Sequence, residues 1–192
     1  MPKNEEPTKP PESDPLVSKL LESRNVIISQ EITDESTQRV VTQLLLLEAA
    51  DASKEIRIFI NSPGGSADGG FAIFDMIRFI KPPVKTIAVG LVASAATIVL
   101  LGAKKDCRLA LPHSRFLIHQ PSTQFYGPAA DIEINAQEML KLREKANQLI
   151  AGETGQTVQK VAADTHRDYW MGPDEAKKYG LIHKVIRTRD EI

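Results

Sequence analysis

The chain has 192 residues, of which 42% are apolar and 26% are charged, and its formal net charge is −1. This balance argues against a nucleic-acid partner, which requires a basic surface, and against an acidic solvating tail. No apolar run reaches the roughly 20 residues that a membrane span needs. The single cysteine, Cys107, excludes an internal disulfide, which favours a reducing, cytoplasmic location.

The first elements follow a charged, proline-containing segment. Residues 1–14 contain prolines and charges of both signs, which predicts a mobile N-terminal arm. The rest of the chain, 15–192, is long enough for one domain with its own core. LVSKLLESR (16–24) has helical spacing, and NVIISQ (25–30) is typical of a strand.

Helices and strands then alternate along the chain. Thr33 or Asp34 is suited to cap a helix, and that helix is expected to turn its apolar face inward. This face comprises Val40, Leu44 and Leu47. EIRIFINSP (55–63) predicts a strand that ends in a Gly-Gly turn.

A helix with an inward-facing stripe follows the Gly-Gly turn. The stripe comprises Phe71, Phe74 and Ile77, and the prolines of KPPV (81–84) end the helix. Three further strands are predicted, followed by two short helices and a closing strand. These are VKTIAVG (84–90), CRLALP (107–112), RFLIHQP (115–121), the helices TVQKVAADTH and DEAKKYG, and the strand LIHKVIR.

Residues 128–151 form the longest predicted helix, with Pro128 suited to its first turn and Gly152 to its exit. Its apolar stripe comprises Ile132, Ala136, Met139, Ala146 and Ile150. At 1.5 Å per residue such a helix is roughly 36 Å long, about the width of a small domain. We therefore expect it to project and to pack on another subunit.

The alternation of strands and helices predicts the α/β class. No strand leads into GxGxxG, and no GxxxxGK[ST] loop is present, so neither motif for binding a nucleotide cofactor is found. The four histidines lack HExxH spacing, and one cysteine cannot form a zinc cluster. Metal ligation is therefore not expected.

Ser94 is the first candidate for chemistry. In GLVASAATIVLLGA (90–103) it stands after a strand, where small residues give way to an apolar run. A serine there either caps a helix or acts as a nucleophile. A helix this apolar must be buried, so its N-terminus is expected to line a crevice. A serine nucleophile needs a base, an acid that orients the base, and N–H donors for the oxyanion.

The stretch INSPGGSADGG (60–70) follows a strand and begins a helix. Gly64 and Gly65 can adopt unusual φ angles and let the backbone approach a ligand. The alternative is a plain strand-to-helix turn in which Ser66 or Asp68 is the cap.

His119 ends an apolar strand just before Pro121. It is either a satisfied residue at the sheet edge or a base that faces a cleft. Asp168 lies beside Tyr169 and Trp170, where partial burial would favour a hydrogen bond from a histidine N–H. The alternative for Asp168 is a surface ion pair with its neighbour in the sequence, Arg167.

Taken together, these segments closely resemble the ClpP family, the proteolytic subunit of the Clp protease, from about Leu20 to Ile186. The resemblance is carried by FINSPGGSADGGFAIFDMIRFIKP, GLVASAAT, LALPHSRFLIHQP, ADIEINAQEMLKLREKANQL and ETGQTVQKVAADTHRDYWMGPDEAKKYGLIHKVI. Several motifs in the same order are far more specific than any one of them.

The resemblance implies a crotonase-like α/β fold with a projecting handle over about 122–151. It assigns Ser94 as nucleophile, His119 as general base, Asp168 as the group that orients it, and the amides of Gly64 and Ala95 as the oxyanion hole. It implies two stacked seven-membered rings, or a mixed barrel with a second paralogue, that cut unfolded polypeptides into short peptides. A hexameric AAA+ ATPase partner uses the ATP, so this chain itself is expected to need no cofactor.

Several positions depart from the family's usual residues, among them Ala95, where methionine is usual. Ala96 stands where glycine is usual and tolerates positive φ poorly. Pro128 removes an N–H before the handle, His166 replaces an acidic residue, and Arg57 puts a charge in the pocket where the ATPase docks. These changes spare the triad, which favours a divergent paralogue. Two alternatives therefore stay open: a structural subunit that cleaves little itself, and a crotonase-type enzyme acting on acyl-CoA thioesters.

Overall fold

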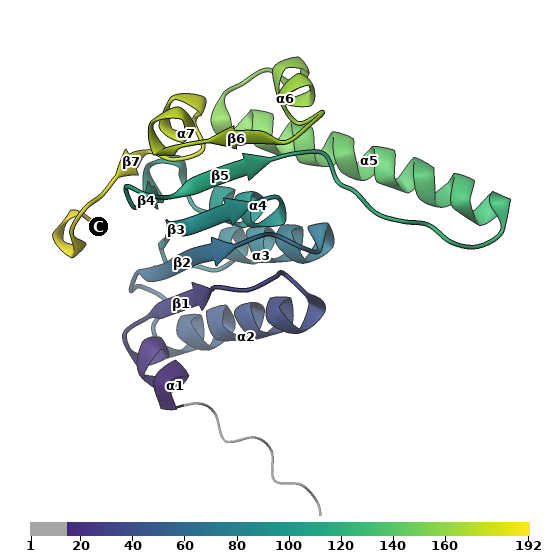
Figure 1. Ribbon diagram of the computed structural model, residues 1–192. Coiled ribbons are helices and arrows are strands. Elements are labelled where there is room, and N and C mark those ends of the chain that lie inside the picture. Colours follow the sequence, from purple (N-terminus) through teal and green to yellow (C-terminus); the bar gives the residue numbers. More distant parts are fainter. Residues whose placement is uncertain (1–14) are drawn as a thin grey trace, which may run out of the picture.

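The computed structural model describes residues 15–192, and a seven-stranded sheet forms its centre (Figure 1). The strands are β1 (Asn25–Ile28), β2 (Ile56–Ser62), β3 (Val84–Ala93), β4 (Arg108–Ala110), β5 (Arg115–Ile118), β6 (Tyr169–Met171) and β7 (Lys184–Val185). The order β1-β2-β3-β4-β7 is parallel throughout, which confirms the predicted α/β class. The predicted mobile arm, residues 1–14, lies outside the described residues.

Helices connect the strands and bury the sheet. They are α1 (Pro15–Glu22), α2 (Asp34–Ala50), α3 (Ala67–Phe79), α4 (Ala95–Leu101), α5 (Ala129–Thr154), α6 (Val158–Asp164) and α7 (Pro173–Tyr179), with short 3-10 turns at Lys105–Cys107 and Arg189–Glu191. The helices α2, α3 and α4 pack in succession beside the sheet. Their apolar faces and the inner strands form one main core cluster.

The caps and stripes predicted for α2 and α3 are largely confirmed. Thr33 is the N-cap of α2, where its side chain accepts from the Ser36 amide, and the Ser36 hydroxyl in turn accepts from the Thr33 amide. In α3, Phe71 and Ile77 are buried as expected, whereas Phe74 is only half-buried beneath the Arg78 guanidinium. These caps fix where each helix begins relative to the strand before it.

Strand β3 changes its partner at Gly90, which has a φ of 77°. Before this glycine, residues 86–88 pair with β4, and after it residues 91–93 pair with β5. The predicted strand ended at Gly90 because glycine usually marks a turn. Here the strand continues through it to Ala93, and the change of partner places Ser94 beside β5, where its amide donates to the Leu117 carbonyl at 2.9 Å.

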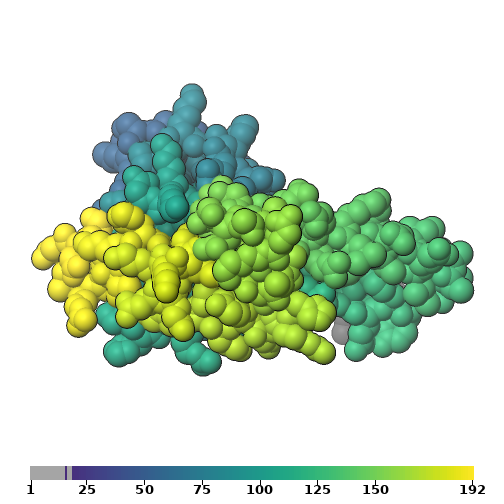
Figure 2. Space-filling model, turned by 90° about the horizontal axis from the view of Figure 1, so that it is seen from above, coloured from purple at the N-terminus to yellow at the C-terminus, as the bar shows by residue number. Residues whose placement is uncertain are grey.

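The helix α5 projects from the body, as predicted. Figure 2 shows its N-terminal half, in green, extending away from the rest of the molecule. Pro128 is the N-cap rather than a first-turn residue, and the helix runs through Gly152 to end at Gly155, which has a φ of 79°. Of the predicted stripe, Ile150 is buried and Met139 half-buried, whereas the stripe is exposed toward the N-terminus.

One strand was not predicted from the sequence. Residues 169–171 form β6, which pairs antiparallel to β5 with Ile118 opposite Tyr169. The Arg115 guanidinium lies 4.5 Å from the centroid of the Trp170 ring, which helps hold the two strands together. The closing strand is also shorter than LIHKVIR and covers Lys184–Val185 alone.

Candidate active site

Three candidate segments lie where parallel strands end. Gly64 follows β2, Ser94 follows β3, and His119 follows β5. These strands are neighbours in the parallel part of the sheet, with β3 between β2 and β5. Because the carboxyl ends of parallel strands meet at one edge, the topology brings the three segments together.

Ser94 has the backbone conformation of a sharp strand-to-helix turn. Its φ is 56° and its ψ is −123°, a combination that a non-glycine residue rarely adopts. It stands at the N-cap position of α4, yet its side chain makes no capping hydrogen bond. The interpretation of Ser94 as a serine that caps the helix with its side chain is therefore wrong. Its hydroxyl is left available for other chemistry.

Gly64 lies directly against this turn. A Cβ placed on Gly64 would lie 2.7 Å from Ser94 Cβ and 3.0 Å from the Ala95 amide nitrogen. Gly64 also has a φ of 96°, so only glycine fits here without strain. The glycine turn and the start of α4 are thus in close contact, as the two proposed halves of an oxyanion hole must be.

The amides of the two adjacent glycines have different surroundings. The Gly64 amide donates to Ser62 Oγ at 3.2 Å, which occupies it within this chain. Gly65 lines the cleft beside Ser94 and Ala95. The sequence pattern of two adjacent glycines does not distinguish between them, because either amide of the pair can face a ligand.

His119 and Asp168 meet across β5 and β6. His119 Nδ1 lies 3.1 Å from Asp168 Oδ1, within hydrogen-bond distance. The two residues adjoin the paired positions Ile118 and Tyr169, so the strand register positions them. Asp168 is not buried among aromatic residues as expected, because 62% of its side chain is exposed.

Ser94 and His119 line one cleft of about 540 Å³. No hydrogen bond joins the two side chains within the described part of the chain. Apolar residues cover one wall of the cleft: Phe71, Ile98, Met139, Leu142, Ala146 and Ile150.

Across residues 15–192, no three side chains of His, Cys, Asp or Glu are grouped so as to hold a metal ion. None of the helices formed by these residues combines the length and apolarity needed to cross a membrane.

Comparison with models of known protein families identifies the family to which this chain belongs. The model of the family described as Clp protease matches residues 8–189. This chain belongs to the Clp protease family. The resemblance found in the sequence is thereby confirmed over nearly the whole chain.

Individual Clp relatives agree with this assignment. The chain is 52% identical over 188 residues to the ATP-dependent Clp protease proteolytic subunit 2 of Treponema denticola, covering 98% of this chain and 94% of the relative. It is 47% identical over 174 residues to proteolytic subunit 1 of Bacillus cereus, covering 91% and 90%. A solved structure of a ClpP1 mutant from Listeria monocytogenes is 44% identical, with a TM-score of 0.84 over 91% of this chain and 98% of that one. The predicted ClpP fold is confirmed, and the chain is a Clp proteolytic subunit by relationship.

The structure shows the surroundings of two residues that depart from the family's usual ones, Ala96 and Arg57. Ala96 needs no positive φ, because among the described non-glycine residues only Arg24 and Ser94 have one. The expected distortion at Ala96 is therefore absent. Arg57 is half-buried, and its Nε lies 3.0 Å from Glu55 Oε1, so its charge is balanced within the chain.

Proposed function

We propose that this Clp proteolytic subunit is itself a serine endopeptidase, with Ser94, His119 and Asp168 as its catalytic triad. The observation that carries the proposal is the hydrogen bond between Asp168 and His119, because His119 lines the same cleft as Ser94. A carboxylate on Nδ1 holds the imidazole in the tautomer whose Nε2 can accept a proton from a serine. The crotonase-type thioester alternative has no use for this arrangement.

The proposed reaction is acyl transfer. Ser94 Oγ attacks the peptide carbonyl while His119 takes its proton, and the same imidazole protonates the departing amine. The Ala95 amide and an amide of the Gly64–Gly65 turn donate to the oxyanion, and Gly65 is the better placed of the two glycines. Water then releases the acyl group from Ser94. No metal or cofactor takes part in these steps.

The proposed setting is a barrel of rings in the cytoplasm. The subunits form two stacked heptamers, or a mixed barrel with a second paralogue, and an AAA+ ATPase supplies unfolded polypeptides at the expense of ATP. The exposed apolar part of α5 supports a contact between subunits. The numbered names of the relatives, subunit 1 and subunit 2, fit a chain that has paralogues.

A fluorophosphonate probe tests the proposal. Labelling is expected at Ser94 and is expected to disappear in Ser94→Ala and His119→Ala, together with cleavage of a short fluorogenic peptide. Ser53→Ala, which changes an exposed serine hydrogen-bonded to Asp51, is the matched control and keeps both signals. Absence of labelling in every assembled form contradicts the proposal.

A purely structural role is the second candidate, and the missing Ser94–His119 hydrogen bond favours it. Such a chain would be silent alone but would raise the activity of a partner subunit. If Ser94→Ala leaves that increase intact, the structural role is correct.

A further inference from the structure

Arg108, at the start of β4, is the largest fully buried side chain of the described residues. Its Nε donates to the Ala103 carbonyl at 2.8 Å, and its Nη2 donates to the Leu101 carbonyl at 3.0 Å. Its Nη1 donates to the Glu153 carbonyl at 3.0 Å, and its Nη2 also pairs with the Glu153 carboxylate. Burial lowers the pKa of Arg108, and the neighbouring carboxylate opposes this shift.

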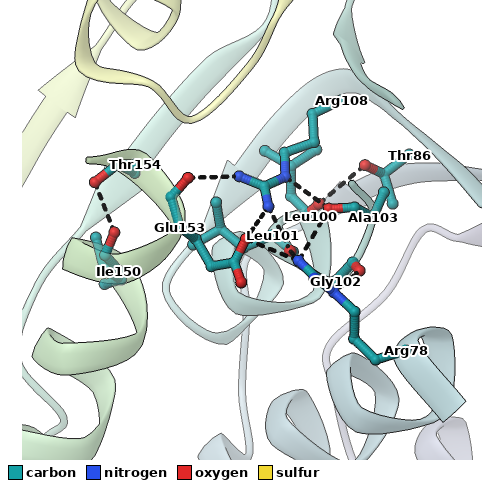
Figure 3. A network of polar contacts seen from close by, with 10 residues as sticks. All are labelled: Arg78, Thr86, Leu100, Leu101, Gly102, Ala103, Arg108, Ile150, Glu153 and Thr154. Atoms are coloured by element: carbon teal, nitrogen blue, oxygen red, sulfur yellow. Dashed lines mark hydrogen bonds and ion pairs between the residues drawn. The ribbon is translucent and has the colours of Figure 1, made fainter. Parts of the chain in front are cut away.

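Arg78 of α3 reaches the same carbonyls from the other side, as Figure 3 shows. Its Nε donates to the Gly102 carbonyl at 2.5 Å, and its Nη2 lies 2.8 Å from Glu153 Oε2. Glu153 therefore holds two guanidinium groups, and both of them bind the carbonyls that follow α4.

These contacts fix one end of the helix that carries Ser94 at the other. The helix α4 has only 7 residues, and its last carbonyls have no partner within the helix. Besides the two arginines, Thr86 Oγ1 donates to the Leu100 carbonyl at 2.9 Å. A short, fully buried helix moves as a unit, so a shift at its C-terminal end displaces Ser94.

Glu153 belongs to the last turn of α5, the helix that also forms the apolar wall of the cleft. The N-terminal half of α5 is exposed and projects from the body. Glu153 lies at the opposite, buried end of the helix, next to Ile150, Ala151 and Thr154. Glu153 thus links α5 to the end of α4 through its carboxylate, which contacts both arginines, and through its main-chain carbonyl, which accepts from Arg108.

We propose that Glu153 is a positioning residue that couples α5 to α4, through Arg78 and Arg108, and so sets Ser94 for catalysis. This inference rests on the proposed peptidase function. Glu153 itself does not line the cleft among the described residues. The competing explanation is that the network stabilises the fold and leaves the reactivity of Ser94 unaffected.

The test compares Glu153→Ala with Glu153→Gln, whose amide oxygen still accepts a hydrogen bond. In Glu153→Ala, the rate of fluorophosphonate labelling at Ser94 per folded molecule is expected to fall about tenfold, with KM for a short peptide unchanged. Glu153→Gln is expected to recover most of that rate. Hydrogen exchange across residues 92–99 is expected to accelerate in Glu153→Ala, which reports the coupling without any catalysis.

Glu48→Ala is the matched control, because Glu48 is a helical carboxylate of α2 that accepts the Lys81 amide at 2.9 Å. It is expected to leave both labelling and exchange unchanged. Should Glu153→Ala fail to fold, Arg78→Lys is used instead. It keeps the charge but loses the guanidinium that donates to three carbonyls, those of Leu101, Gly102 and Ala103, and a labelling rate about threefold lower is expected.

The inference is overturned if the variants lower only the unfolding temperature, with wild-type labelling per folded molecule and wild-type exchange across 92–99. If the wild-type protein is not labelled at Ser94, the proposed function fails instead. In that case the exchange measurement alone decides whether Glu153 couples the two helices.

Discussion

Asp168 is the most exposed of the three proposed catalytic side chains, and its role depends on one contact. Its carboxylate meets His119 Nδ1 at 3.1 Å, while most of its surface faces solvent. A carboxylate in this place acts by orienting the imidazole and by stabilising the imidazolium that forms. Removal of the Asp168 carboxylate should therefore lower the rate of peptide cleavage and leave the fold intact.

Asp168→Asn is expected to lower kcat by about 10²–10⁴-fold, because the amide favours the wrong imidazole tautomer. The circular dichroism spectrum should match that of the wild type, since the side chain is exposed. Asp174→Asn, in the first turn of α7, serves as the control. A kcat within about twofold of the wild type would show that His119 needs no carboxylate.

Gly64→Ala tests the contact between the glycine turn and Ser94. The new Cβ would meet the Ala93 carbonyl at 2.6 Å and Ser94 Cβ at 2.7 Å, at a φ of 96°. We expect a loss of about 2–4 kcal/mol in the free energy of unfolding, measured by urea denaturation, and loss of labelling at Ser94.

Gly152→Ala is the matched control for this substitution. Gly152 lies inside α5, and a Cβ added to it would meet nothing within 4 Å, so alanine should stabilise the helix by about 0.5–1 kcal/mol. Equal effects at the two glycines would contradict the proposed fit at Gly64.

The position of each residue at a strand end made Ser94 and His119 candidates, and the family resemblance then suggested their roles. A serine before an apolar helix and a histidine at the end of a strand are visible in the sequence. The choice between Gly64 and Gly65 was not, because it depends on the buried Ser62 hydroxyl that accepts the Gly64 amide. The exposure of Asp168 was also hidden, because flanking aromatic residues suggested burial and the Trp170 ring is itself partly exposed.

At the scale of whole elements, two boundaries differ from the sequence prediction for physical reasons. β3 continues beyond Gly90 because both halves of the strand find partners, one in β4 and one in β5. α5 continues beyond Gly152 because tertiary packing of its base outweighs the weak helix propensity of one glycine. The strand β6 has only three residues, so its alternation of apolar and polar side chains is too short to predict a strand from the sequence alone.

Arg108→Met tests how far the elements depend on the buried guanidinium. It removes four hydrogen bonds, and the Leu101 and Ala103 carbonyls then keep only their bonds from Arg78. The main-chain carbonyl of Glu153 loses its bond from Arg108. We expect the free energy of unfolding to fall by about 3–5 kcal/mol, as measured by urea denaturation. Arg57→Met, which breaks a half-exposed pair with Glu55, should cost less than about 1 kcal/mol.

An Arg108→Met variant that is not destabilised would also have a physical explanation. If Arg108→Met is as stable as the wild type, methionine packs well enough to replace the polar network, as happens for some buried ion pairs. The Arg57 variant then gives the reference for an ordinary surface pair.

At the scale of the molecule, the projecting half of α5 bears apolar side chains in solvent. Ile134 is 61% exposed and Leu140 is 47% exposed. Apolar groups at these levels on one projecting helix favour burial against another chain. The proposed barrel provides that burial.

Ile134→Glu is expected to reduce the assembled fraction and increase the monomeric fraction in analytical ultracentrifugation, because a buried charge would disfavour the contact. Its unfolding transition as a monomer should be unchanged, since Ile134 is exposed within the chain. Glu133→Gln, on the same helix, is the control. An unchanged oligomeric state for Ile134→Glu would place the subunit contact elsewhere.

The positive φ at Ser94 has a consequence for any effort to make this protein more robust. A non-glycine residue in that conformation costs on the order of 1–3 kcal/mol, which the surrounding packing must offset. A library selected for heat tolerance alone would therefore enrich glycine at position 94 and discard the nucleophile. Directed evolution of a hardier enzyme needs a simultaneous selection for peptide hydrolysis.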